Sequence, residues 1–188
     1  MKRHYLRPAF AALLAGTFAL TCLAQLPPEG AEPPKPAAQG EEVVDFKLLL
    51  PLLPEAPPGW KADPPEGSTE DLGEMKLTNV HRDYQKEEAG DAPTTAISIL
   101  DSAANPEYVE STTSAWDADT SDVDGYSKKL SIDGMPGFET FENEGKHGAV
   151  WLLVAKRYFL QIETSGQDPK ELQEWLKRID LKKLAEVK

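Results

Sequence analysis

Proline is concentrated in the first third of this chain, and this limits where regular secondary structure can begin. Five of the 16 residues from Gln25 to Gly40 are proline, and six more prolines lie between Pro51 and Pro65. Because proline lacks an N–H group and biases its predecessor toward extended geometry, neither segment can form a long helix or a central strand. We therefore predict one folded domain over residues 42–188, behind an extended spacer at residues 25–41 that has too few apolar side chains to fold.

The chain starts with the pattern of a secretory signal peptide. Three basic residues within the first seven precede an uncharged apolar run from Ala9 to Leu20, and small residues follow up to Ala24. This run is shorter than the roughly 20 residues that cross a bilayer, so it predicts an export signal over residues 1–24 and not a membrane span. We expect a bacterial protein that is exported to the periplasm or secreted.

The only cysteine, Cys22, lies at the end of this signal and leaves a second interpretation open. A bacterial lipoprotein carries its lipid on a cysteine at this place, but Ala19 and Thr21 match the preceding motif poorly. We favour cleavage after Ala24, which removes Cys22. The alternative is a lipid anchor at Cys22 that holds the chain on the bacterial membrane. In both cases the cysteine serves processing and not catalysis.

After residue 24 the chain is strongly acidic. Without Lys2, Arg3 and Arg7, the 20 basic side chains fall to 17, against 32 acidic ones, which gives a formal charge of −15. Such a charge repels nucleic-acid phosphates and anionic lipid surfaces. We therefore expect no nucleic-acid partner and no membrane contact other than a lipid anchor.

Apolar and polar residues alternate with the period of β-strands along much of the remaining chain. This pattern predicts strands over residues 75–84, 94–100, 126–132, 138–142, 149–155 and 158–164. A shift in apolar parity suggests a bulge near Thr78–Asn79, and Asp133–Gly134 predicts a two-residue hairpin turn. Residues 149–155 are apolar on both faces, so they are expected in the middle of the sheet.

Helical spacing marks three further segments. Asp45 is expected to cap a short helix, which the prolines end, and this segment should pack four large side chains on the domain: Leu48, Leu52, Leu53 and Trp60. Asn105–Pro106 should start a helix that ends near Trp116, and Asp168–Pro169 one that reaches Ile179. Together these elements predict an α+β domain, an antiparallel meander of five to seven strands with two or three helices packed on it.

Few residues offer catalytic or metal-binding chemistry. After the signal the histidines are His81, expected in a strand, and His147, expected in a hairpin turn, and neither has a second ligand at metal-binding spacing. The sequence has no G-x-S-x-G, S-x-x-K or H-E-x-x-H motif and no phosphate-binding glycine loop. We expect no catalytic residue and no cofactor.

Two features remain as candidates for binding. The acidic run Asp117, Asp119, Asp122 and Asp124 offers oxygen ligands at the spacing that suits Ca²⁺. An EF-hand frame would need glycine at position 122 and glutamate at position 128, where the chain has Asp122 and Lys128, so a solvated loop is favoured over a metal site. Trp60 could line a ligand groove at the proline-rich arm, although packing in the core is favoured there.

Three short stretches carry a resemblance to known proteins. Residues 52–60, 132–138 and 179–184 resemble segments of short exported bacterial proteins of unassigned function. The order of elements is also similar to the PsbP/DcrB-like α/β/α sandwich families. Those families are mostly binding or assembly modules, so the resemblance implies such a module. The matching residues belong to turns and packing positions, and the resemblance assigns no site residue.

The sequence therefore favours a non-catalytic module of the bacterial envelope that binds a protein or a small ligand. Two alternatives stay open. One is a carboxylate-dependent hydrolase of envelope glycans or peptides, which would need two close, buried acidic side chains in a cleft. The other is a calcium-stabilised module at the acidic run.

Overall fold

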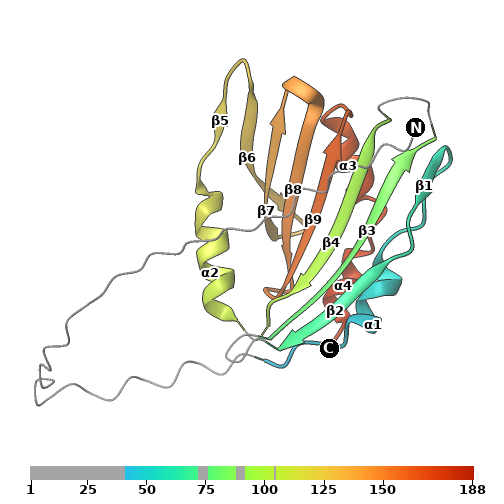
Figure 1. Ribbon diagram of the computed structural model, residues 1–188. Coiled ribbons are helices and arrows are strands. Elements are labelled where there is room, and N and C mark those ends of the chain that lie inside the picture. The colour runs from blue at the N-terminus through green and yellow to red at the C-terminus, as the bar shows by residue number, and fades with distance from the viewer. Residues whose placement is uncertain (1–40, 72–75, 88–91, 104) are drawn as a thin grey trace, which may run out of the picture. The chain divides into compact units, whose positions relative to one another are not determined.

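The fold is built on one antiparallel sheet of nine strands, seen in a computed structural model that describes residues 41–71, 76–87, 92–103 and 105–188 (Figure 1). The predicted signal peptide, Cys22 and nearly all of the predicted spacer lie outside the described residues. In chain order the strands are β1 (Trp60–Ala62), β2 (Glu66–Asp71), β3 (Lys76–Lys86), β4 (Thr94–Asp101), β5 (Thr120–Ser121), β6 (Gly125–Ile132), β7 (Met135–Glu142), β8 (His147–Val154) and β9 (Tyr158–Ser165).

The strand order in the sheet is β1-β3-β4-β9-β8-β7-β6-β5, and β2 also pairs with β3. After β4 the chain crosses to the far edge of the sheet and returns through β5 to β9. Strand β9 then lies between β4 and β8. The predicted turn at Asp133–Gly134 joins β6 to β7, and both residues have the positive φ angles that a tight hairpin requires.

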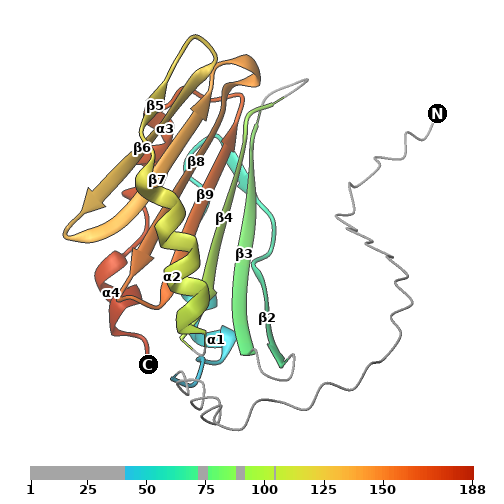
Figure 2. The same ribbon diagram turned by 90° about the vertical axis from the view of Figure 1, so that its left-hand side faces the viewer.

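Short helices lie on both faces of the sheet (Figures 1 and 2). They are α1 (Phe46–Leu49), α2 (Pro106–Ser114), α3 (Lys170–Leu176) and α4 (Leu181–Glu186), with the 3-10 turns η1 (Leu50–Leu52), η2 (Ala115–Asp117) and η3 (Glu144–Lys146). Helices α1, α3 and α4 pack on one face, here called the α3 face. Helix α2 packs on the other, the α2 face.

The main core lies on the α3 face. Alternate strand residues such as Ile97, Val150 and Leu160 are fully buried there against Leu172 and Trp175 of α3. A smaller core on the α2 face contains Trp116, Leu153 and Phe159.

These observations confirm the α+β class and the antiparallel sheet with packed helices. The sheet has more strands than predicted because β2, with the sequence EGSTED, and the two-residue β5 carry no apolar alternation. The helix expected from Asp168 to Ile179 is α3, which ends at Leu176. A further helix that was not predicted, α4, follows it, and the Asp180 side chain caps α4 by accepting from the backbone N–H of Lys183.

Two predictions of local structure are wrong. The pairing of β3 continues without interruption from Thr78 to Gln85 against β4, so there is no bulge at Thr78–Asn79. The apolar parity changes because Leu77 and Val80 simply face opposite sides of the sheet. Leu48 is 51% exposed, because the four-residue helix α1 turns Leu49 inward in its place.

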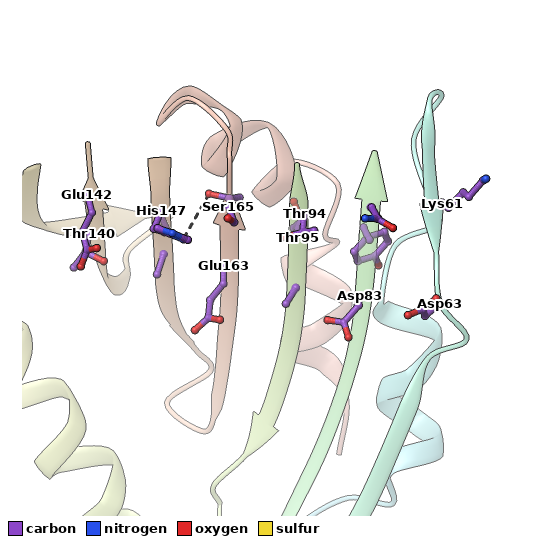
Figure 3. A pocket seen from close by; sticks show the side chains of 16 residues that line it. Lys61, Asp63, Asp83, Thr94, Thr95, Thr140, Glu142, His147, Glu163 and Ser165 are labelled. Carbon is purple, nitrogen blue, oxygen red and sulfur yellow. Dashed lines mark hydrogen bonds between the residues drawn. The ribbon is translucent and has the colours of Figure 1, made fainter. Parts of the chain in front are cut away.

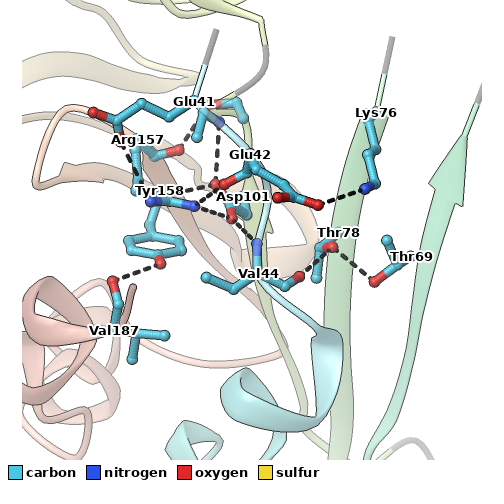
Figure 4. A network of polar contacts seen from close by, with 12 residues as sticks. Glu41, Glu42, Val44, Thr69, Lys76, Thr78, Asp101, Arg157, Tyr158 and Val187 are labelled. Carbon is cyan, nitrogen blue, oxygen red and sulfur yellow. Dashed lines mark hydrogen bonds and ion pairs between the residues drawn. The ribbon is translucent and has the colours of Figure 1, made fainter.

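A buried ion pair holds the start of the domain to the sheet (Figure 4). The carboxylate of Asp101 at the end of β4 is completely buried and accepts from Nε and Nη2 of Arg157 at 3.0 and 2.7 Å. It also accepts from the backbone N–H of Val44 at 2.8 Å, while Arg157 donates to the carbonyl of Glu42 at 3.0 Å. These contacts, here called the Asp101 clamp, join residues 42–44 to β4 and to the β8–β9 turn.

We expect Asp101→Asn to destabilise the domain by about 3 kcal/mol, because it leaves the guanidinium of Arg157 without its bidentate partner. Urea denaturation with circular dichroism measures the loss. The matched control is Asp133→Asn, which removes an exposed aspartate from a turn position where asparagine is equally favoured. A loss no larger than that of the control would contradict a structural role for the clamp.

We also predict a loss of stability at alkaline pH. Burial raises the pKa of Tyr84 and of Tyr158 to about 12 each, from the ordinary value of 10.0. The unfolded chain releases these protons first, so the stabilisation is complete below pH 10 and is lost as the pH rises through 12. Tyrosinate absorbance and urea midpoints measured across this interval test it, and Tyr84→Phe should remove part of the loss.

Candidate functional site

The half of the α2 face that helix α2 leaves uncovered contains an open cleft of about 690 Å³ (Figure 3). Five strands supply its floor. They are the C-terminal ends of β3, β7 and β9 and the N-terminal ends of β4 and β8. Lys61 and Asp63, from β1 and the loop after it, add to one side. Alternate residues of each strand face this side of the sheet. The pairing register of the strands therefore determines which side chains are neighbours in the cleft.

The register places a row of five residues across the floor. Asp83 of β3 is opposite Ala96 of β4, Ala96 is opposite Glu163 of β9, Glu163 is opposite Ala149 of β8, and Ala149 is opposite Thr140 of β7. Polar and small side chains therefore alternate along this row. Figure 3 shows Asp83 and Glu163 pointing to the same side of the sheet from strands that flank β4.

Polar and aromatic residues border this row on its two sides. Toward the rim of the sheet, Thr94 is opposite Ser165, and Glu142 is opposite His147. Toward α2, Gln161 is opposite Trp151, and its amide donates to a carboxylate oxygen of Glu163 at 2.5 Å. Trp151 is partly buried against the small core of the α2 face, which limits its motion.

The cleft is negatively charged. Four carboxylates line it, those of Asp63, Asp83, Glu142 and Glu163, together with one ammonium group, that of Lys61. Lys61 forms an ion pair with Glu87 at 3.9 Å, which is not among the lining residues. The four carboxylates come from separate strands or loops, and no three of them are grouped closely enough to hold a metal ion.

The buried carboxylates of the described residues, Asp101 and Glu139, do not belong to this cleft. Glu139 lies on the α3 face, where it accepts from Gln173 at 2.6 Å and from the hydroxyl of Tyr126 at 2.6 Å and pairs with Lys128 at 2.9 Å. Burial and, next, this hydrogen bond to Glu139 raise the pKa of Tyr126. Both carboxylates are thus held by structural partners.

The structure separates the aromatic and histidine residues that the sequence singled out. Trp60 packs edge-on against Trp175 with ring centroids 5.1 Å apart and does not line the cleft. His81 lies in β3, as predicted, 3.7 Å from a carboxylate oxygen of Glu66. His147 is the first residue of β8 and not part of a turn, and it is the histidine that borders the cleft.

The acidic run is engaged in its own loop. Asp117 pairs with Lys129 at 2.7 Å, which lowers the pKa of Asp117, and Asp119 accepts from the backbone N–H of Lys129. Asp122 accepts from the backbone N–H groups of Asp124 and Gly125 and closes a tight turn. Among the residues that the structure describes, no three His, Cys, Asp or Glu side chains are grouped so that they could hold a metal ion.

Apart from His147, the sequence did not single out the cleft residues. The sequence signal that could have pointed to them was the alternation of polar or small residues with apolar ones along the strands. Ala96 and Glu163, for example, are next to the buried residues Ile97 and Ile162. Alternation shows that such residues face away from the core, but not that they meet.

Three of the four carboxylates of the acidic run already accept hydrogen bonds from backbone N–H groups or pair with Lys129. We therefore expect millimolar CaCl₂ to leave the melting temperature unchanged. Asp122→Ala should lower the melting temperature slightly, equally with and without calcium, since it removes two turn hydrogen bonds. Thermal unfolding with MgCl₂ as the ionic-strength control measures both. A rise specific to calcium that Asp119→Ala abolishes would show a metal site here.

Comparison of the chain with protein-family models, with curated proteins and with solved structures gave no match. The resemblance to PsbP/DcrB-like families therefore stays a prediction. Within the described part of the chain, no helix has the length and apolar character needed to span a membrane.

Proposed function

We propose that this chain is an exported, non-catalytic module of the bacterial envelope that binds a small polar ligand in the cleft on the α2 face. The observation behind this proposal is the cleft between Asp83 and Thr140. The small side chains of alanine leave open space on its floor, and polar side chains border that space. Its volume, about 690 Å³, lies within the range of roughly 300–1,000 Å³ that small-molecule sites occupy. Export rests on the signal pattern of residues 1–24.

The character of the carboxylates supports binding rather than hydrolysis. A carboxylate-dependent hydrolase needs one carboxyl group that burial or a close partner keeps protonated. In the cleft Asp83 and Glu163 are exposed and lie two strands apart, roughly 10 Å between backbones at the usual strand spacing. The buried carboxylates, Asp101 and Glu139, face cationic partners elsewhere.

The test is recovery of the ligand with the protein. The full chain is purified from its native envelope without denaturation, and small molecules released by denaturation are identified by mass spectrometry. We expect one compound to be enriched with the wild type and lost from a variant in which Ala96→Leu and Ala149→Leu fill the floor of the cleft.

The matched control is Ala185→Leu, which makes the same kind of substitution once, at an exposed position of α4. It should retain the compound. The proposal fails if no compound is enriched over the doubly filled variant, or if the control loses it equally.

A further inference from the structure

Each alanine of the cleft floor forms a small bay between two polar side chains. Adjacent strands are about 4.8 Å apart, so the side chains that flank an alanine stand roughly 10 Å from each other. The first bay, over Ala96, lies between Asp83 and Glu163. The second, over Ala149, lies between Glu163 and Thr140. The two bays share Glu163 and are neighbours along a line that crosses the strands.

The groups around the bays can both accept and donate hydrogen bonds. Asp83 and Glu163 only accept, whereas the hydroxyls of Thr140, Thr94 and Ser165 do both. A ligand that matches them must offer donors and acceptors at many points along its length. A single bound cation would need several oxygen ligands around one position, which the separated carboxylates do not provide. They are better suited to accept hydrogen bonds from several hydroxyl groups of a ligand.

The bays also present apolar surface. Their floors are alanine methyl groups. Trp151 follows Ala149 by two residues on the same face of β8; it is not one of the cleft-lining residues and lies next to the Ala149 bay on its α2 side. Trp151 is partly exposed and lies against Phe138, with ring centroids 6.3 Å apart. Its ring therefore offers a rigid edge or face against which a flat C–H surface can pack.

From this combination we infer that the ligand is a saccharide, with one pyranose ring over the Ala96 bay, the next but one over the Ala149 bay, and the ring between them beside Glu163. A pyranose ring has hydroxyl groups at its rim and an apolar C–H face, which are the two kinds of surface that the bays match. The four carboxylates exclude acidic sugars by repulsion, so the saccharide is neutral or carries amino groups. This inference rests on the proposed function and specifies the class of its ligand.

The experiment measures binding of chitotetraose, cellotetraose and maltotetraose to the full chain by calorimetry and by NMR shifts of backbone amides. We expect at least one tetrasaccharide to bind and to shift amides of β4, β8 and β9. Ala96→Leu and Ala149→Leu should each weaken it about tenfold or more through steric overlap, and Ala185→Leu should not. Affinity should change little with salt, since none of these three tetrasaccharides carries a charge.

Spermidine serves as a cationic comparison. If it binds at the cleft and is displaced by salt while no tetrasaccharide binds, the saccharide assignment is overturned. Absence of binding by all three sugars, or sugar binding that both alanine substitutions leave unchanged, overturns it as well. A non-saccharide compound recovered with the native protein would reject this inference while the proposed function stood.

Trp151→Leu and Trp151→Phe test the apolar border separately. The first should weaken the sugar and the second should retain most of the affinity, because an aromatic face remains. Melting temperatures identify a variant that fails to fold, in which case the two alanine substitutions decide the matter alone.

Discussion

Strand β9 pairs with β4 along all eight of its residues, and this pairing joins two parts of the sheet that the chain builds separately. Strands β1 to β4 form one part, and the meander from β5 to β9 forms the other. The paired residues are 57 to 71 positions apart, from Asp101–Tyr158 to Thr94–Ser165, so their contact closes a long loop at a high cost in chain entropy. The main core exists only once this pairing is made, because its strand residues come from both parts.

Buried polar side chains fix both ends of this pairing. At one end the Asp101 clamp joins β4 to the turn before β9. At the other, the amide of Gln167 donates to the carbonyl of Thr94 at 2.6 Å and to the hydroxyl of Thr95 at 2.8 Å, and its oxygen accepts from the indole of Trp175. These bonds satisfy polar groups that burial would otherwise penalise, and they tie the register to helix α3.

Local patterns predicted much of the fold, and their limits follow from physics. The alternation around Ile97 and Ile162 and the Asp133–Gly134 turn are local signals, so their strands and hairpin were predicted correctly. Strand β2 was missed because its EGSTED sequence forms a strand only by pairing with β3. The cleft could not be predicted at all: Asp83 and Glu163 are 80 residues apart in the chain and meet only through the pairing of β9 with β4.

The Asp101 clamp also fixes where residues 42–44 join the sheet. The clamp and the last residues of the chain meet near the start of β9, where Arg157 binds Glu42 and the hydroxyl of Tyr158 donates to the carbonyl of Val187 at 3.0 Å. The cleft lies toward the opposite ends of the same strands, and its floor at Ala96 is five residues, or roughly 17 Å, from Asp101 along β4. The point where residues 42–44 join the sheet and the cleft therefore lie toward opposite ends of β4 and β9, so the clamp does not obstruct the cleft.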